Sequence, residues 1–391
     1  MKTKSLMTAL LWLVTVVASA NDGVFYVNGS QIEPLQETDI AVSKEILTIS
    51  IGDDGFARVD VQYEFINRGK AKTVDVGFEA SGPYDPGSDG TFNKAGKHPH
   101  IFDFTVEMNG TKLPIRNYVM RESTEDGVAD FTPLDLNVWT QSGDDCEGLR
   151  KKNTDEYINF SYAYCFKAAF KEGKNVVHHT YRYRMSSAID ECFSIPYWLL
   201  PAMRWANHQI DDFTLRLKAD KTAKHFCMRM DDNVWKKSPW KLTSGVGKVR
   251  TVHSQWAGGG DYVEFVLRNG TFEWHITNFR PTQNIRITSP ECVANSENVK
   301  LGSYYDPKIG IGFYRRRYED ENGSMSGGTT DGIPNKRILR NLPYAYRGYV
   351  FKDAKLKAYF NKIWWYMPDP NWNQDTSDFT EAEWELVNEN K

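Results

Sequence analysis

Residues 47–65 read LTISIGDDGFARVDVQYEF, and this stretch decides the fold of most of the chain. Apolar residues alternate with polar ones on both sides of the turn-forming Asp53-Asp54-Gly55. Because successive side chains of a β-strand point to opposite faces, the pattern predicts two antiparallel strands with one apolar and one polar face. A slip of one residue would turn every side chain to the wrong face, so the pairing register is well specified.

The same period of two recurs along the chain and predicts a mainly antiparallel, sandwich-like β body. Further alternating runs lie at residues 74–78, 104–108, 176–183, 213–217 and 263–267. Asn109-Gly110 and Asn269-Gly270 favour tight hairpin turns. Residues 192–207 differ, because they are densely apolar and contain Pro196 and Pro201. We expect one short buried helical segment there, with its ends set by the prolines.

The overall composition indicates a folded chain and argues against a nucleic-acid partner. A length of 391 residues suggests two or three domains, and 40% hydrophobic residues are ample for a core. The 48 Lys and Arg residues against 51 Asp and Glu residues give a net charge of −3, and removing residues 1–20, which carry Lys2 and Lys4, lowers it to −5. Since nucleic-acid binders carry clustered positive charge, we expect no nucleic-acid partner.

Residues 1–20 have the features of a secretory signal peptide. Lys2 and Lys4 form a positive end, residues 6–17 an apolar run, and Ala18-Ser19-Ala20 a small-residue cleavage site. No later apolar run approaches the ~20 residues that a membrane helix needs, so we expect no membrane span in the mature chain. The pattern predicts export through the secretory pathway, to the periplasm or the extracellular space.

The cysteines are compatible with an oxidising compartment but their spacing does not fix a pairing. All five (Cys146, Cys165, Cys192, Cys227 and Cys292) lie after the signal peptide, and none forms a CxxC motif. A disulfide between Cys192 and Cys227 is possible, and closing that loop would stabilise the chain by roughly 3–4 kcal/mol.

The C-terminal part changes character. Residues 319–335, EDENGSMSGGTTDGIPN, have no periodicity and are predicted to be a linker. Residues 336–391 then predict a small α-helical module, with Leu356, Tyr359 and Phe360 on one helical stripe. Thr380 followed by Glu383 forms a capping box for a last helix that would bury Trp384 and Val387. Pro343 predicts a helix break or a fresh start.

This module resembles the YARHG domain, which occurs at the ends of exported bacterial proteins. The matching positions are Leu339-Arg340-Asn341, Tyr344-Ala345, Gly348-Tyr349, Phe351, Leu356, Tyr359-Phe360, Trp365-Tyr366 and Pro368. The signature itself departs, because Tyr346 and Arg347 stand where the family has Arg and then His. A function that depends on that His therefore does not carry over, and the resemblance implies an envelope-associated accessory role.

The body, residues 21–318, looks like domain of unknown function 4424, a family of exported bacterial proteins. The resembling segments are Asn21-Asp22-Gly23, Asp39-Ile40-Ala41, residues 45–50, 61–67, 179–182, 205–213 and Phe226-Cys227. The likeness implies a fold and a location but supplies no substrate.

A catalytic or metal-binding constellation is not evident in the sequence, and no cofactor is predicted. His178 and His179 are adjacent and would point to opposite faces of a strand, so they cannot share a metal. His98 and His100 could share a face but lack an acidic partner at ligand spacing, and we interpret them as surface-loop residues. Gly323-Ser324-Met325-Ser326-Gly327 has the letters of a nucleophile elbow, yet it lies in the predicted linker.

The aromatic cluster of the C-terminal module is the one feature that could bind a partner. Trp364, Trp365, Tyr366 and Trp372 lie close together in the sequence, near Arg347 and Tyr349. Such residues suit glycan or peptide contact, but a small module also needs them for its core. We expect Trp365 to be core, and we name Arg347, Tyr349, Trp364 and Tyr366 as candidate binding residues.

These observations favour an exported cell-envelope protein that is a non-catalytic binding or scaffold protein. Its partner would be cell-wall glycan or another envelope protein. Two alternatives stay open: an envelope-acting hydrolase whose site is assembled only in three dimensions, and a glycan- or peptidoglycan-binding protein of the adhesin type.

Overall fold

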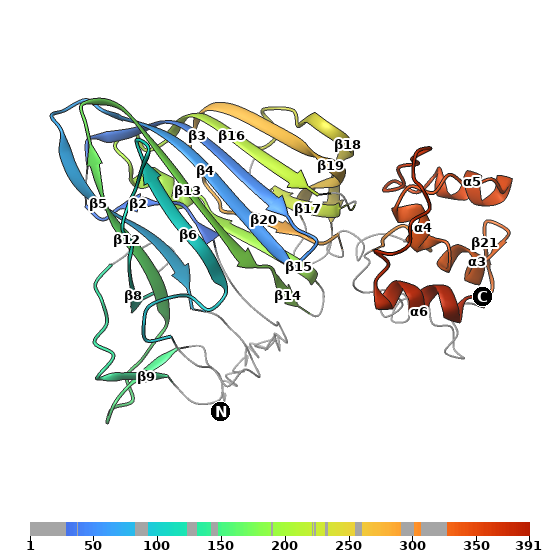
Figure 1. Cartoon of the computed structure of the whole chain (residues 1–391), viewed down its shortest axis with the longest axis horizontal. Coiled ribbons are helices and arrows are strands. Elements are labelled where there is room, and N and C mark those ends of the chain that lie inside the picture. The colour runs from blue at the N-terminus through green and yellow to red at the C-terminus, as the bar shows by residue number, and fades with distance from the viewer. Residues whose placement is uncertain are drawn as a thin grey trace, which may run out of the picture.

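The computed structural model describes residues 29–36, 38–82, 93–122, 131–141, 148–188, 191–220, 222, 224–230, 234–254, 260–290, 301–305 and 327–391. The signal peptide, Asp22, Cys146, Cys292 and most of the predicted linker lie outside these residues. The described part consists of a β body and a helical C-terminal module, as the sequence predicts (Figure 1).

The body is a sandwich of a 13-stranded and a 4-stranded sheet within the described residues. The larger sheet contains β1 (Gly29–Ser30), β3 (Ile40–Ile51), β4 (Phe56–Asn67), β6 (Ile101–Met108), β7 (Thr111–Lys112), β13 (Gly173–Arg184), β14 (Ser186–Ala188), β15 (Glu191–Trp198), β16 (Ile210–Ala219), β17 (Lys224–Met230), β18 (Lys241–Ser254), β19 (Gly260–Phe279) and β20 (Ile285–Thr288). The smaller sheet contains β2 (Glu33–Pro34), β5 (Lys72–Ser81), β8 (Arg116–Arg121) and β12 (Phe160–Phe170). A further small sheet consists of β9 (Trp139–Gln141), β10 (Leu149–Lys151) and β11 (Tyr157–Ile158).

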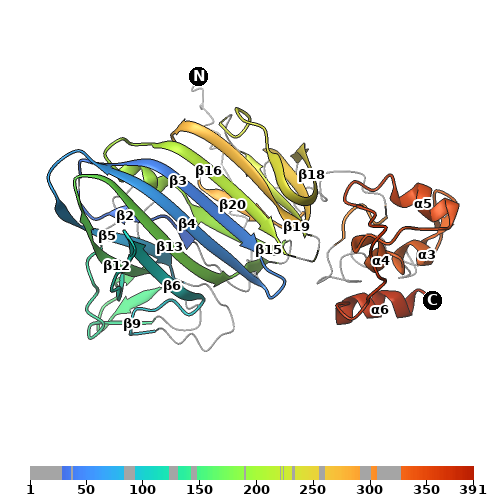
Figure 2. The ribbon, with the colours of Figure 1, turned by 45° about the horizontal axis from the view of Figure 1, so that its top comes forward.

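The hairpin of residues 47–65 forms the centre of the larger sheet. β3 and β4 pair antiparallel with Leu47 opposite Val61 and Ile49 opposite Val59, and these side chains are almost fully buried. The order β19-β16-β3-β4-β13-β6 then extends the sheet on both sides (Figure 2). Phe78 of β5 packs edge-on against Tyr181 of β13 at 5.1 Å, so the apolar faces of the two sheets form one core.

Residues 192–207 correct the helical prediction. β15 runs through Trp198, and only Leu200–Arg204 form a 3-10 helix, η1, which begins at Leu200-Pro201. Phe193, Ser194 and Ile195 follow one another and are all buried, so this strand is covered on both faces. A strand covered on both faces is apolar along its whole length, which explains the dense apolar composition of the segment.

Asn269-Gly270 is a second correction, because it is not a hairpin turn. β19 continues through it, and the register with β18 shifts between Ser244 and Val246. Asn269 has φ +46°, and a Cβ on Gly270 would lie 2.3 Å from the carbonyl oxygen of Ser244. Asn269-Gly270 therefore lies at a bulge, where the backbones of the paired strands β18 and β19 approach each other closely. Asn109-Gly110 does form the predicted turn between β6 and β7.

The disulfide considered possible between Cys192 and Cys227 does not form in the structure. Cys192 lies on β15 and Cys227 on β17, and β20 separates the two strands. Two strand spacings amount to about 9.6 Å, whereas the Cα atoms of a disulfide are roughly 4.4–6.8 Å apart.

The C-terminal module has its own core, which includes Leu339, Leu342, Phe360 and Trp365. Its elements are β21 (Thr329–Thr330), β22 (Ile333–Pro334), α3 (Asn335–Leu339), α4 (Leu342–Tyr346), α5 (Ala354–Phe360) and α6 (Glu381–Glu389). Among the residues that the structure describes, no helix is long and apolar enough to cross a membrane.

The local predictions for this module are largely confirmed. The carboxylate of Asp353 accepts from the amides of Lys355 and Leu356 at the start of α5, and the Thr380–Glu383 capping box starts α6. Pro343 lies in the first turn of α4, which is the predicted fresh start. Trp384 is an exception, because it is 39% exposed while Glu383 takes the buried position beside it.

Residues 301–305, which precede the predicted linker, pack on this module. The indole of Trp365 donates to the carbonyl of Gly302 at 2.9 Å, and the hydroxyl of Tyr305 donates to Glu383 at 2.6 Å. The small helical module thereby gains an additional layer of apolar contacts.

Candidate functional site

Arg347, the first of the predicted binding residues, is 8% exposed and lies at the end of α4. It pairs with both carboxylate oxygens of Glu383 at 2.8 Å and with the carboxylate of Asp378 at 2.7 Å. It also donates to the carbonyls of Pro343 and Asp378, so all five of its N–H donors are used within the chain. Burial lowers the pKa of Arg347, but the bonds to Glu383 and Asp378 outweigh it and raise the pKa above its ordinary value.

Tyr349 and Tyr366 belong largely to the packing of the module. The hydroxyl of Tyr366 donates to the carbonyl of Tyr349 at 2.6 Å, and Tyr366 is 3% exposed. Tyr349 is half-buried and meets Phe351 edge-on at 5.0 Å. Trp365 is 2% exposed, which confirms its predicted place in the core.

Trp364 is placed differently, because it faces the body. The guanidinium of Arg250 lies 4.5 Å from the centre of its ring, and the ring of His225 lies 5.8 Å away. Next to this contact, the ammonium of Lys248 donates to the carbonyls of Trp364 and Tyr366 at 3.1 and 2.8 Å. Arg268 donates to the carbonyls of Arg347 and Met367, both at 3.3 Å. The module therefore contacts the body through cations of β18 and β19.

A buried charged network lies beneath this contact. Glu264 of β19 accepts from Arg250 at 2.5 Å and bonds the Nε2 atom of His225 at 2.7 Å. Both Glu264 and His225 have side chains that are only 1% exposed. Burial raises the pKa of Glu264, but the bonds with His225 and Arg250 outweigh it and hold the pKa below its ordinary value. The carboxylate is thus ionised and fully engaged.

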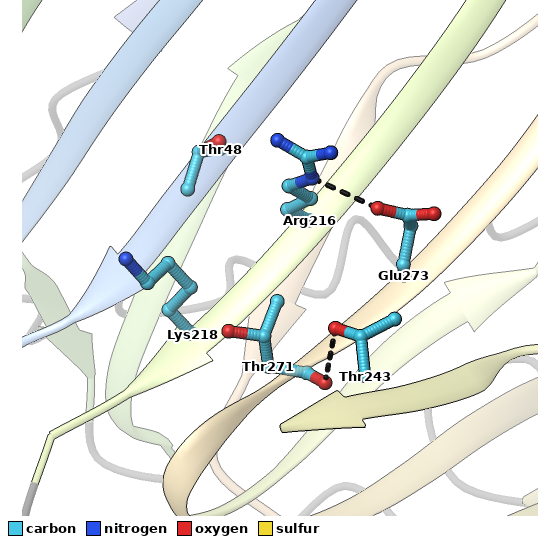
Figure 3. A pocket seen from close by; sticks show the side chains of 6 residues that line it. All are labelled: Thr48, Arg216, Lys218, Thr243, Thr271 and Glu273. Atoms are coloured by element: carbon cyan, nitrogen blue, oxygen red, sulfur yellow. Dashed lines mark hydrogen bonds and ion pairs between the residues drawn. The ribbon is translucent and has the colours of Figure 1, made fainter. Parts of the chain in front are cut away.

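A second site, which sequence reasoning missed, is an open hollow on the polar face of the larger sheet. We call it the sheet basin and define it by the residues that line its volume of about 330 Å³: Thr48, Arg216, Lys218, Thr243, Thr271 and Glu273 (Figure 3). These side chains come from the four strands β3, β16, β18 and β19. Thr48 is opposite Arg216 in the parallel pair β3–β16, and Glu273 is opposite Arg216 in the antiparallel pair β16–β19.

The two cations of the sheet basin, Arg216 and Lys218, differ in their ion pairing. Arg216 donates through Nε to Glu273 at 2.9 Å (Figure 3), and no described residue bonds its two terminal nitrogens. Lys218 is exposed, and among the residues that the structure describes its ammonium has no ion-pair partner. The hydroxyls of Thr48 and Thr271 lie beside these cations (Figure 3).

The histidines are placed as follows. His178 bonds Asp60 at 3.0 Å while His179 is fully buried on the other face, which confirms the predicted opposition of the two side chains. His98 is 2% exposed and bonds the carbonyl of Ser81 and the amide of His100, so it is not a surface residue as predicted. Burial, and then the neighbouring His100, lower the pKa of His98 to about 3. Within the described part of the chain, no three His, Cys, Asp or Glu side chains could together hold a metal ion.

Comparison with known proteins places the C-terminal module in a family and the whole chain in a fold. Residues 336–391 match the YARHG domain, so the resemblance inferred from the sequence is confirmed for this segment. This domain is typical of exported proteins. No curated protein matches the chain.

Among solved structures, the chain is similar to a candidate nutrient-binding protein from Legionella pneumophila. The two share 16% sequence identity with a TM-score of 0.54, and the similarity covers 95% of this chain and 100% of the other. An M1 zinc metallopeptidase variant from Deinococcus radiodurans shares 9% identity with a TM-score of 0.25 over 66% of this chain and 44% of the other. The first similarity shows a shared fold, and the second is too low to support an argument.

Proposed function

We propose that this chain is an exported, non-catalytic binding protein of the cell envelope whose sheet basin holds a carboxylate-bearing segment of cell-wall glycan. The observation that carries the proposal is Lys218, a cation without an ion-pair partner among the described residues, on the same strand face as Arg216. Side chains two residues apart on a strand share a face, so the two cations are held side by side by the sheet itself.

The chemistry of the sheet basin suits this ligand. A carboxylate can accept from the terminal nitrogens of Arg216 and from Lys218, and such charge-assisted bonds are the stronger kind. Threonine hydroxyls and the carboxylate of Glu273 can bond the hydroxyls of a sugar. An open basin at the polar face, rather than a closed cleft, suits one segment of a long polymer.

Two further observations support the proposal. The YARHG domain at residues 336–391 fits an exported protein. The resemblance of residues 21–318 to domain of unknown function 4424, inferred from sequence alone, is compatible with the same location. The Legionella protein is described as nutrient-binding, and its shared fold is compatible with a binding role.

Co-sedimentation of the mature protein with purified peptidoglycan tests the proposal. We expect Lys218→Met and Arg216→Met each to weaken retention by about tenfold, as the loss of one bond to a charged group predicts, and added salt to weaken it further. Lys174→Met is the matched control, because Lys174 pairs with Glu64 on the same polar face, away from the basin. A protein that is not retained, or a control that weakens retention equally, would contradict the glycan assignment.

A further inference from the structure

Residues 29–34, which we call the N-terminal strap, join the two sheets of the sandwich. β1 pairs with β15 of the larger sheet, and β2 pairs with β5 of the smaller sheet. The hydroxyl of Tyr181 donates to the carbonyl of Ser30 at 3.4 Å. The indole of Trp205 donates to the carbonyl of Ile32 at 3.3 Å. Because each strand of the strap is only two residues long, few backbone bonds oppose its local opening.

Two polar side chains of the strap are buried, and each forms a hydrogen bond that involves a carboxyl group. The amide of Gln31 donates to Glu45 of β3 at 2.5 Å. The carboxyl of Glu33 accepts from Arg204 at 2.6 Å. Gln31, Glu33 and Glu45 are each at most 4% exposed. The strap therefore lies against one buried carboxyl of the body and contributes a second one itself.

Glu45 lies in the core because of a bulge in β3. The register of β3 with β4 shifts between Val42 and Lys44, so Ser43 is an extra residue. In a regular strand Lys44 would share the core face of Val42. The extra residue instead turns Lys44 to the polar face and Glu45 to the core. Bulges are conformations that re-aim a side chain, and this one places an ionisable group inside the sandwich.

Among the described residues, no cation pairs with Glu45. The groups around its carboxyl are the amide of Gln31 and the hydroxyls of Tyr63 and Tyr197. Its Oε2 atom has no hydrogen-bond partner within the described part of the chain. An unpaired carboxylate is too costly to bury, so Glu45 is protonated in the folded body. Burial raises its pKa well above the ordinary value, despite the opposing effect of the bond from Gln31.

Glu33 interacts with charges of both signs. Burial raises its pKa to about 7, while Arg204 lowers it and Glu79 of β5 raises it. The thiol of Cys165 on β12 also interacts with Glu33. Glu33 and Glu45 thus both have a higher pKa in the closed strap than the ordinary value of 4.5.

We propose that the N-terminal strap is a pH-sensitive closure of the sandwich, docked while Glu33 and Glu45 carry their protons and opening as the pH rises. Opening places both carboxyls in water, where each ionises above about pH 4.5. Their stabilisation of the strap is complete below that pH and is lost as the pH rises through the folded-state pKa of each group. Opening also frees the edges of β15 and β5 that the strap covers. This inference does not depend on the glycan proposal, because the strap and the sheet basin share no residue.

Hydrogen exchange of the mature full-length protein tests the proposal, measured by mass spectrometry from about pH 5 to about pH 8 and corrected for the intrinsic effect of pH on exchange. Two protons leave on opening, so the opening constant of the strap should rise about 100-fold per pH unit between ~5 and ~6.5. Above pH ~7 only Glu45 still releases a proton, and the rise should fall to about tenfold. Glu33→Gln and Glu45→Gln keep the shape of the neutral carboxyl, and each should lower the rise to about tenfold throughout.

Two controls separate the strap from other effects. Glu64→Gln changes an exposed carboxyl that pairs with Lys174, and should leave the rise unchanged. The amides of β4 report unfolding of the whole body and should stay protected while the strap opens. If Glu45→Gln does not fold, the wild type and Glu33→Gln still decide the outcome. The proposal is overturned if opening of the strap does not depend on pH, if either Gln variant keeps the 100-fold rise, or if β4 opens together with the strap.

Discussion

The body and the C-terminal module both bury aromatic and aliphatic side chains, but charged groups play different parts in them. On the polar face of the body, ion pairs such as Lys174–Glu64 are exposed, with side-chain exposures of 55% and 35%. In the module, the pair between Arg347 and Glu383 has exposures of 7% and 0%. Exposed pairs contribute about 0–1 kcal/mol, whereas removing one partner of a buried pair is strongly destabilising. The exposed pairs of the polar face thus add little to stability, whereas the module holds a buried pair whose loss is costly, as the body does at Glu264.

Replacing Arg347 by Leu should have the largest effect and tests this difference directly. The change leaves the buried carboxylate of Glu383 without its partner, and we expect the module to lose about 3–5 kcal/mol. Hydrogen exchange measured by mass spectrometry should show faster exchange in α4 and α6, while β3 and β4 keep their protection. Lys174→Met is the control and should change stability by less than ~1 kcal/mol. Equal loss of protection in body and module would contradict the idea of two separate cores.

His179 allows the same comparison inside the body. Its ring is fully buried among Tyr63, Phe104 and Tyr181, and neither nitrogen has a hydrogen-bond partner within the described residues. Burial, and then the neighbouring His178, lower the pKa of His179 to about 3. The unfolded chain binds this proton near pH 6.5, so the group's contribution is present above that pH and is lost as the pH falls towards 3.

His179→Leu should therefore stabilise the body, by about 1 kcal/mol near neutral pH, because it removes an unpaired buried polar group at similar volume. The advantage over the wild type should grow by about 1.4 kcal/mol for each pH unit below ~6. Urea unfolding of both proteins at neutral pH and at about pH 5 measures this difference. Taking the difference removes the opposing contribution of Glu33, whose pKa burial raises to about 7 despite the lowering by Arg204. A difference that does not change with pH would show that His179 is already protonated in the folded state.

The sequence predicted those elements that depend on interactions between residues close together in the chain. The alternation at residues 47–65 and the Thr380–Glu383 capping box both depend on neighbours within a few residues. The helical prediction for residues 192–207 was wrong because a strand covered on both faces has the same dense apolar composition as a buried helix.

The sheet basin could not be predicted from the sequence, because it depends on contacts between distant segments. The parallel pairing of β3 with β16 brings Thr48 beside Arg216. Parallel strands are joined by long connections, so no local sequence pattern predicts which two strands will pair. The alternation at residues 213–217 predicts a strand with one polar face, but it does not show that Lys218 lacks an ion-pair partner among the described residues. The role of Arg347 could not be predicted either, because its ion-pair partners Asp378 and Glu383 are distant in sequence.

Tyr366→Phe should have the smallest effect, and it separates packing from binding within the predicted aromatic site. The change removes only the hydroxyl that donates to the carbonyl of Tyr349, while the ring stays in the core. A single neutral hydrogen bond contributes about 1 kcal/mol, so the module should lose roughly that much and the body nothing. Hydrogen exchange in α5 measures the stability, and co-sedimentation with peptidoglycan measures the retention of the same variant. If Tyr366 is a packing residue, retention stays at the wild-type level. A large loss of retention with unchanged exchange would instead assign Tyr366 and its neighbours Tyr349 and Trp364 to a ligand.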